Sequence, residues 1–282
     1  MSPDAAVEID RVGKRYGRQW ALRECTLSLP AGRIIALVGA NGAGKTTLLH
    51  LAIGLIRPTE GSVSLLGEPL RPGTLSQVGF VAQDHPLYRG FTVAEMLRYG
   101  RVTNTRFDQA GAERRLRELD IPLERKTGRL SGGQQAQVAL TLALAKRPRL
   151  LVLDEPVASL DPLARRDFMK TLIDAVAEVD VTVLLSSHVV TELERICDYL
   201  VLLRGGQVRL ADDIDGLLAG HRVLTGPRVD EAPLDGLVAA THGDRNSHLL
   251  VRQPATAPTH PRWESHPVNL EDLVIAYLEG QG

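Results

Sequence analysis

The residues with the clearest chemical purpose lie in one short stretch, GANGAGKT, from Gly39 to Thr46. Glycines such as Gly42 and Gly44 can adopt positive φ angles and turn backbone N–H groups inward toward a bound anion, where larger side chains would crowd it. Lys45 supplies a positive charge for β- and γ-phosphates, and Thr46 offers a hydroxyl to Mg²⁺. The unbroken G-x-x-x-x-G-K-T spacing therefore predicts a site for a nucleoside triphosphate.

The elements around this stretch favour phosphate binding over two alternatives. Residues 34–38 are an apolar run typical of a buried strand, and a helix is expected from Thr46 to about Ile56, with its positive dipole end toward the nucleotide. A glycine-rich turn that binds nothing would not need this context. A dinucleotide-binding turn has a different glycine spacing and no Lys-Thr pair.

Three further buried runs end in polar side chains that suit the same chemistry. Asp154 and Glu155 follow RLLVL, Gln83 follows SQVGFVA, and His188 follows VTVLLSS. We expect Asp154 to hold Mg²⁺ together with Thr46, and Glu155 to take a proton from water attacking the γ-phosphate. Gln83 could contact Mg²⁺ or orient that water, and His188 could donate to the γ-phosphate. Taken alone, Gln83 could be a solvated loop residue and the histidine could be structural.

The segment LSGGQ predicts a second phosphate-seeking element. Ser131 and Gln134 have the spacing of a capping box at the start of a helix. Gly132 and Gly133 are unexpected there, because glycine in a helix costs up to about 1 kcal/mol relative to alanine. We therefore expect a close backbone approach at this point, and a phosphate at the helix N-terminus would account for it.

Two other sites belong to the same hypothesis. Tyr16 is expected in the first loop of an N-terminal β-layer, where its ring could stack on a purine or simply be half exposed. Ser159 and Asp161, in VASLD, are expected beside the nucleotide pocket.

The remaining pattern predicts an α/β fold. Residues 5–29 alternate like an antiparallel β-layer, 92–129 have helical spacing, and Gly205-Gly206 marks a hairpin turn. We expect a P-loop NTPase core with a mostly parallel sheet and flanking helices in residues 1–220, and an inserted helical subdomain at about 84–147. Residues 221–282 are expected to form a small α+β extension of unknown role. A zinc site built from its histidines (His242, His248, His260 and His266) is disfavoured, because their spacing does not suit zinc.

Composition limits the setting. Lys plus Arg number 33 and Asp plus Glu 34, a formal charge of −1, so no nucleic-acid partner is expected. The two cysteines, Cys25 and Cys197, fit buried thiols in a reducing compartment. The start carries acidic residues and does not resemble a secretory signal, and no apolar run approaches the roughly 18 residues of a membrane span. If the protein works at a membrane, another chain must supply the span.

These motifs stand in one order, and over residues 5 to about 215 the chain resembles the nucleotide-binding subunits of ABC transporters. Gly39–Thr46 matches that family's Walker A motif, Gln83 its Q-loop, 130–134 its LSGGQ signature, and 151–155 its Walker B. The D-loop corresponds to 159–161 and the switch histidine to His188, while Tyr16 falls at the adenine-stacking position. The resemblance implies nucleotide contacts from one set of residues: Tyr16, Gly39, Asn41, Gly42, Gly44, Lys45, Thr46, Thr47, Ser131, Gly132, Gly133, Gln134 and Asp161.

The resemblance also implies a mechanism with ATP and Mg²⁺. Two copies, or one copy and a paralogue, would hold ATP head to tail between the glycine turn of one and Ser131-Gly132-Gly133 of the other. Hydrolysis would drive a separate membrane permease at the inner face of the cell membrane, which would dock near residues 83–98. Stretches such as GFTVAEML are similar to those of exporters. One departure is that Gln135-Ala136-Gln137 stands where the family usually has a basic residue, which puts that helix's polar links in doubt.

Two rival functions remain open. A soluble ABC-type ATPase could act without transport, although no long coiled coil separates the glycine turn from the signature and only one cassette is present. The iron–sulfur assembly type is harder to exclude. A regulatory switch that hardly hydrolyses nucleotide is disfavoured by the presence of Glu155 and His188.

Overall fold

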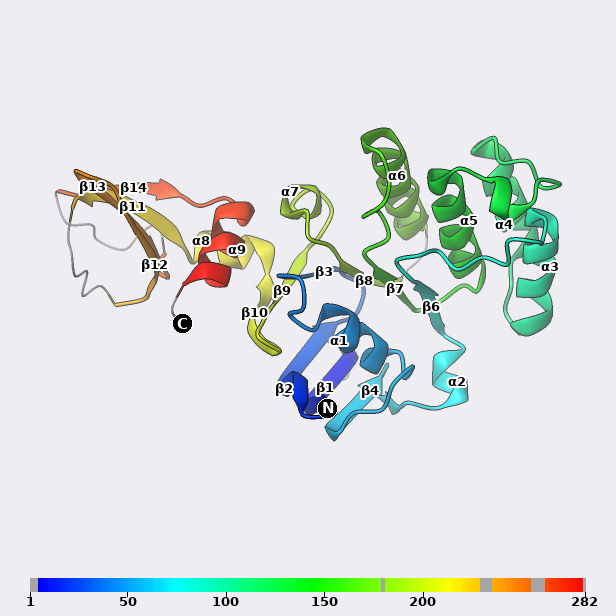
Figure 1. Ribbon diagram of the computed structural model, residues 1–282, viewed down its shortest axis with the longest axis horizontal. Helices are drawn as coiled ribbons and strands as arrows, with labels where there is room; N and C mark the ends of the chain where they lie inside the picture. Colours follow the sequence, from blue (N-terminus) through cyan, green and yellow to red (C-terminus); the bar gives the residue numbers. More distant parts are fainter. Residues whose placement is uncertain (1–4, 179–180, 229–234, 255–261, 281–282) are drawn as a thin grey trace.

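The computed structural model describes residues 5–178, 181–228, 235–254 and 262–280. Figure 1 shows a β-rich centre with helices gathered at the right of the view and a smaller sheet at the left. The expected α/β architecture is confirmed. No helix of the described residues has both the length and the apolar character needed to cross a membrane.

The centre is a six-stranded sheet in the order β10-β9-β3-β8-β7-β6. Its strands pair in parallel except β10, which is antiparallel to β9. Side chains of β3 alternate between two buried clusters, with Ile35 and Leu37 on one face and Ala36 and Val38 on the other. Both faces are covered, as the apolar run predicted. The strands are β3 (Ile34–Gly39), β6 (Val78–Val81), β7 (Leu150–Asp154), β8 (Thr182–Ser186), β9 (Tyr199–Arg204) and β10 (Gln207–Asp213).

The N-terminal layer is a second, antiparallel sheet in the order β2-β1-β4-β5. Tyr16 is the last residue of β1 and pairs with Gln19, so it lies in the strand rather than in the predicted loop. The strands are β1 (Ala5–Tyr16), β2 (Gln19–Pro30), β4 (Glu60–Leu65) and β5 (Glu68–Pro69). A short helix, α2 (Pro72–Leu75), follows β5.

The helix after the glycine turn, α1 (Lys45–Ala52), is shorter than the sequence pattern predicted. Gly54 has φ 69°, and its N–H bonds to the carbonyl of Leu51, while the N–H of Leu55 bonds to that of His50. This left-handed ending is one that glycine favours, and it stops the helix before Ile56.

A helical lobe extends from the edge of the central sheet. It contains α3 (Val93–Thr103), α4 (Gln109–Glu118), a 3₁₀ turn (Thr127–Arg129) and α5 (Gly132–Ala145), which share a buried cluster. Thr92 and Glu95 form a capping box at α3, so the first helix of the lobe begins where the helical spacing was expected to start. In Figure 1, α6 (Pro162–Glu178) lies between α5 and the centre of the sheet, and β8 is followed by α7 (Val190–Leu193).

The C-terminal part shares its core with the rest of the chain. Leu270, Leu273 and Val274 of α9 (Leu270–Glu279) belong to the same buried cluster as Leu217 of α8 (Ile214–Ala219) and Leu202 of the central sheet. Its sheet, in the order β12-β13-β11-β14, has a second small cluster on its other face. The predicted boundary at residue 220 therefore crosses a continuous core. The strands are β11 (Arg222–Pro227), β12 (Leu237–His242), β13 (Asn246–Val251) and β14 (Glu264–Pro267).

The thiols and histidines of special interest have ordinary surroundings. Cys25 and Cys197 are buried and unbridged, as expected. Among the described residues, no group of three or more His, Cys, Asp or Glu side chains lies close enough together to hold a metal ion. His242 bonds to Ser247 and His248 to Thr225, whereas His260 lies outside the described residues.

Candidate nucleotide site

A cavity of about 600 Å³ lies at the carboxyl edge of the central sheet, where the segments after β3, β6, β7 and β8 meet. In an open parallel sheet this edge is where ligands bind. The lining residues are Ala21, Asn41, Gly42, Gly44, Lys45, Thr46, Thr47, Gln83, Glu155, Ala158 and His188. The fold thus brings together all the catalytic residues that we expected and six of the thirteen residues expected to contact the nucleotide.

The glycines of the turn have different reasons for being glycine. Gly42 has φ 79°, and a side chain there would enter open space. A Cβ at Gly44 would lie 2.8 Å from the carbonyl oxygen of Ala21, and one at Gly39 would lie 2.5 Å from that of Leu203. The predicted crowding of an anion therefore applies at most to Gly42, because the other two glycines make room for the protein's own backbone.

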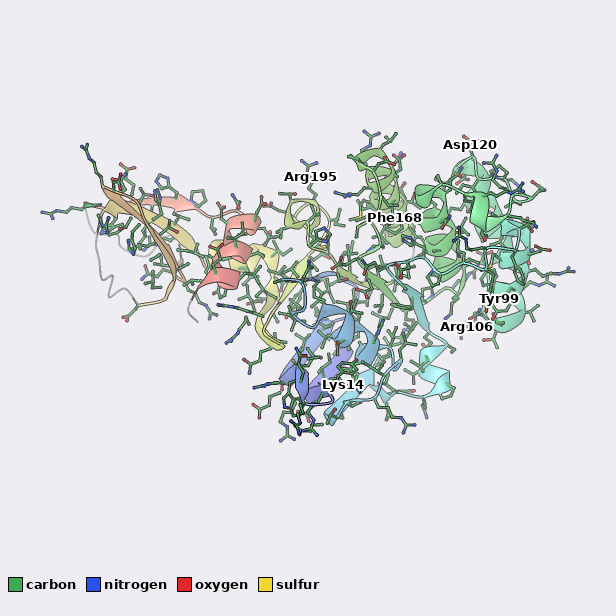
Figure 2. The ribbon with its side chains drawn as sticks, viewed as in Figure 1. Lys14, Tyr99, Arg106, Asp120, Phe168 and Arg195 are labelled. Atoms are coloured by element: carbon green, nitrogen blue, oxygen red, sulfur yellow. The ribbon has the colours of Figure 1, made fainter. Side chains whose placement is uncertain are left out.

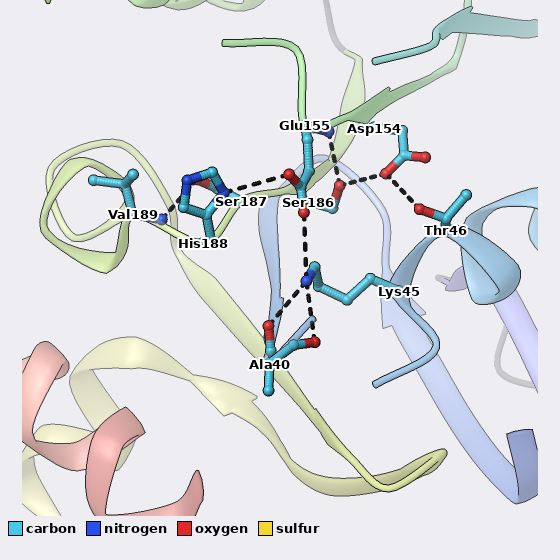
Figure 3. Close-up of polar contacts among 10 residues, drawn as sticks. Ala40, Lys45, Thr46, Asp154, Glu155, Ser186, Ser187, His188 and Val189 are labelled. Atoms are coloured by element: carbon cyan, nitrogen blue, oxygen red, sulfur yellow. Dashed lines mark hydrogen bonds and ion pairs between the residues drawn. The ribbon is translucent and has the colours of Figure 1, made fainter. Parts of the chain in front are cut away.

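Lys45 is held inside the cavity by backbone and by charge. Its side chain is only 5% exposed, and its Nζ donates to the carbonyls of Gly39 at 2.9 Å and Ala40 at 3.4 Å. The carboxylate of Glu155 lies 3.4 Å from the same nitrogen (Figure 3). At α1, Gly44 supplies no side-chain cap, so the N–H groups of the first turn can face a ligand.

Asp154 is positioned by two hydroxyls. Its Oδ1 accepts hydrogen bonds from Ser186 Oγ at 2.7 Å and Thr46 Oγ1 at 3.3 Å. The side chain is almost fully buried. Ser186 Oγ also accepts the backbone N–H of Glu155 at 2.9 Å, so one hydroxyl links the two acidic residues (Figure 3).

The carboxylate of Glu155 lies between the side chains of Lys45 and His188. Its Oε1 is 3.4 Å from Lys45 Nζ, and its Oε2 is 3.3 Å from His188 Nδ1. Its backbone has φ 44°, a left-handed conformation that non-glycine residues avoid and that recurs at functional sites. The imidazole of His188 is half exposed at the mouth of the cavity. This arrangement places a carboxylate next to the lysine that is expected to bind phosphate.

The donor set suits Mg²⁺. Thr46 and Asp154 are in hydrogen-bond contact, and Gln83 lines the same cavity. All three offer oxygen atoms, which this hard cation prefers. When bound, Mg²⁺ would neutralise part of the charge on a polyphosphate.

The signature segment forms its capping box as expected. Ser131 Oγ accepts from Gln134 N–H at 3.2 Å, and Gln134 Oε1 accepts from Ser131 N–H at 3.2 Å. A Cβ at Gly133 would lie 2.8 Å from Ala164 Cβ of α6, whereas one at Gly132 would have nothing closer than 3.9 Å. The close approach predicted here exists within the chain at Gly133. Gly132 faces open space, and none of the four residues lines the nucleotide cavity.

Tyr16 and Asp161 also lie outside the cavity lining. Tyr16 is 53% exposed, with Lys14 Nζ 5.2 Å from its ring centre. Asp161 accepts from the N–H groups of Leu163 and Ala164 and so caps α6.

Two positioning residues escaped the sequence analysis. Ser186 is one, although its place beside Asp154 in the parallel register follows once β7 and β8 are paired. His85 is the other: its Nε2 lies 2.8 Å from the carbonyl oxygen of Pro156, directly after Glu155. Burial lowers the pKa of His85, which favours the neutral ring. No signal in the sequence marks that contact.

Gln135 and Gln137 stand where the family usually has a basic residue, and both make hydrogen bonds. Gln135 Nε2 donates to the carbonyl of Leu130 at 3.0 Å, and Gln137 Nε2 donates to Thr171 Oγ1 of α6 at 3.2 Å. The helix thus has polar links without a basic residue.

Comparison with known proteins agrees with this geometry. The family model described as "ABC transporter" matches residues 22–158. Nod factor export ATP-binding protein I of Cupriavidus pinatubonensis is 37% identical, over 96% of this chain and 90% of that protein. Sulfate/thiosulfate import ATP-binding protein CysA of Pectobacterium atrosepticum is 33% identical, over 95% and 81% respectively. A solved ATP-binding subunit of an ABC transporter superposes with a TM-score of 0.67 at 30% identity, covering 75% of this chain and 91% of that one. The chain therefore belongs to the ATP-binding subunits of ABC transporters, a family of transport-coupled ATPases.

Proposed function

We propose that two copies of this chain, or one copy and a paralogue, hydrolyse ATP in shared sites and thereby drive solute export through a separate membrane permease. In each site the glycine turn of one subunit and the signature helix of the other enclose the nucleotide. The subunits work at the inner face of the membrane, where the permease holds them.

The observation that carries this proposal is that the two elements expected to bind phosphate, the glycine turn and the N-terminus of α5, lie apart in one chain. Lys45 lines the cavity, whereas Ser131 and Gly132 do not. Gly132 nevertheless begins an α-helix and faces open space, which suits a phosphate from a second subunit.

The geometry supports distinct roles for the residues at the cavity. Lys45 and the α1 N-terminus bind the β- and γ-phosphates. Glu155 takes the proton of the attacking water, and His188, beside it, orients the carboxylate and contacts the γ-phosphate. Thr46, Asp154 and Gln83 would hold Mg²⁺.

Export is favoured over import by the extent of the likeness to the Nod factor exporter subunit, which reaches 37% identity over nearly the whole of both chains. Import is the second candidate, because the sulfate/thiosulfate importer subunit matches almost as much of this chain at 33% identity. Vesicles containing the subunit and its permease would separate the two directions, since only an importer moves solute toward the face that binds ATP.

An exposed aromatic patch supports docking to a permease. Tyr88, Phe91 and Tyr99 are all at least 39% exposed, and ring centres lie 5.2 Å apart for Tyr88–Phe91 and 5.4 Å for Tyr88–Tyr99. The patch follows Gln83 in the chain and lies on the helical lobe, where Figure 2 labels Tyr99. Clustered exposed aromatics are characteristic of protein interfaces.

A photo-cross-linking residue at Tyr99 tests this docking, with one at exposed Asp120, elsewhere on the lobe (Figure 2), as the control. We expect a cross-link to an integral membrane protein from position 99 only. Equal products from both positions, or none from membranes of the native cell, would favour the soluble ATPase as the alternative.

Subunit mixing tests the shared site. Lys45→Ala destroys the glycine-turn half and Ser131→Arg the signature half, so each variant alone should be inactive. In an equal mixture, about half the dimers are mixed and each regains one of two sites, so about a quarter of wild-type ATPase activity should return. If mixing restores nothing while mixed dimers are detected, or if Ser131→Arg alone is fully active, the site is not shared.

A further inference from the structure

A second cavity, of about 330 Å³, is lined by residues of α4, α5 and α6. Figure 1 shows where these three helices lie in the chain's helical part. It shares no lining residue with the nucleotide cavity. Its volume is at the lower end of the range for small-molecule sites, about 300–1,000 Å³. An occupant would contact both the helical lobe and α6 of the core.

The wall of this cavity carries excess positive charge. Three arginines and one carboxylate line it, Arg114, Arg115, Arg147 and Asp108, so the lining has a formal charge of +2. Arg147 pairs with Asp108 at 2.9 Å, and Arg115 donates to the carbonyl of Thr171. Within the described residues Arg114 makes no hydrogen bond. The hydrogen bond from Arg147 is the main cause that lowers the pKa of Asp108, and the charge of Arg114 adds to the effect. Arg114 is exposed and can turn its guanidinium toward a ligand.

The floor holds an unpaired hydroxyl. Thr141 of α5 is 1% exposed and lines the cavity, yet its Oγ1 has no hydrogen-bond partner among the described residues. Buried hydroxyls in native proteins almost always have a partner. A ligand atom at the floor would provide one.

The rest of the lining is apolar. Ala112, Leu144, Ala175 and Val181, from α4, α5, α6 and the segment before β8, surround the space and are at least largely buried. Inorganic phosphate would leave these side chains without contact, whereas an organic body of several carbons would cover them. The lining therefore fits a ligand with an anionic group, an apolar body and one further polar atom.

We propose that this cavity binds a small organic carboxylate whose carboxylate group pairs with Arg114, whose apolar body fills the space between α4, α5 and α6, and whose second oxygen bonds to Thr141. The site is independent of ATP binding and does not rest on the proposed function. Its occupant joins the helical lobe to the core across the α5–α6 contact, where Gln137 already bonds to Thr171.

The probes are hexanoate, 6-hydroxyhexanoate, hexanol and inorganic phosphate, titrated into the full chain at constant ionic strength by calorimetry or ligand-observed NMR. Hexanoate should bind saturably, and hexanol and phosphate at least about tenfold more weakly, because each lacks half of the match. The terminal hydroxyl of 6-hydroxyhexanoate should strengthen binding severalfold.

Three variants assign the contacts. Arg114→Gln should weaken hexanoate binding about tenfold or more, since it removes a charge-assisted hydrogen bond. Arg117→Gln is the matched control: it removes the same charge from the same helix at an exposed position that does not line the cavity, and binding should be unchanged. In Thr141→Val the advantage of 6-hydroxyhexanoate over hexanoate should disappear.

The proposal is overturned if hexanoate shows no saturable binding, or if the two arginine variants weaken it equally. Phosphate binding as tight as that of hexanoate would show that the apolar lining plays no part. An unchanged preference for 6-hydroxyhexanoate in Thr141→Val would remove the hydroxyl contact at the floor.

Discussion

Removing the hydroxyl of Ser186 should disturb both acidic residues of the nucleotide site. Ser186 is fully buried, donates to Asp154 Oδ1 at 2.7 Å and accepts the N–H of Glu155 at 2.9 Å. In Ser186→Ala both groups lose this partner, although Asp154 keeps the weaker contact with Thr46 at 3.3 Å.

The size of the effect follows from these contacts. A hydrogen bond to a charged group contributes about 1.5–3 kcal/mol, and a buried donor left unpaired costs about 1–3 kcal/mol. The two losses share one atom and are not additive, so we expect about 2–4 kcal/mol of lost stability. The bond also helps to hold Glu155 at φ 44°, and a shift of its carboxylate should lower kcat about 10- to 100-fold. ATP affinity should change less, because Lys45 and the glycine turn are untouched.

The matched control is Ser187→Ala. Ser187 is the neighbouring buried serine, and its Oγ accepts the N–H of Val189 at 3.1 Å without contacting either acidic residue. Urea unfolding and steady-state ATPase assays on both variants give the comparison. The reasoning is refuted if Ser186→Ala is no less stable than Ser187→Ala and keeps kcat within about twofold of wild type.

Three other predictions concern the base, the buried histidines and the signature glycines. Glu155→Gln should keep ATP affinity in calorimetry but lose about 10²- to 10⁴-fold in kcat; half of wild-type turnover would move the base elsewhere. Burial is the main cause that lowers the pKa of His85 and His221 below 6.5, so the unfolded chain binds more protons than the folded chain at acid pH. The free energy of unfolding should therefore be level above pH 6.5 and fall below it. Each histidine contributes at most about 1.4 kcal/mol per pH unit, and a His85→Gln/His221→Gln chain should show a flatter profile of urea midpoints; an identical profile contradicts this. Gly133→Ala should lose about 1–3 kcal/mol of stability against α6, whereas Gly132→Ala should fold normally and lose ATPase activity; equal stability losses would contradict the assigned packing.

The sequence predicted the central elements because their signals are local. Apolar runs gave β3, β7 and β8, and the polar residues directly after them had to meet at one edge once the strands were parallel. The capping residues Thr92 and Ser131 likewise marked where α3 and α5 begin. Such predictions need only the order of residues along one element.

The sequence-based predictions were wrong or incomplete where a residue contacts a segment that is distant in the chain. Gly44 makes room for Ala21 of β2, and Gly39 for Leu203 of β9, although both belong to a motif that suggests phosphate alone. Sequence spacing likewise gave no sign that α9 returns to share a buried cluster with α8, on the other side of the expected boundary at 220. Composition and spacing carry no record of these approaches.

The contact between His85 and Pro156 shows what such distant approaches can do for function. Gln83 and the aromatic patch stand on either side of His85 in the chain, and Pro156 directly follows Glu155. A buried hydrogen bond of 2.8 Å therefore ties the segment proposed to dock the permease to the segment that carries the base. Movement of Tyr88 or Phe91 that drew His85 away would have to break this bond or displace the backbone beside Glu155. Because that backbone is already held in a left-handed conformation, a small displacement there changes the position of the carboxylate relative to Lys45. In the proposed function, docking and hydrolysis would thus be linked through a bond that lies outside every sequence motif.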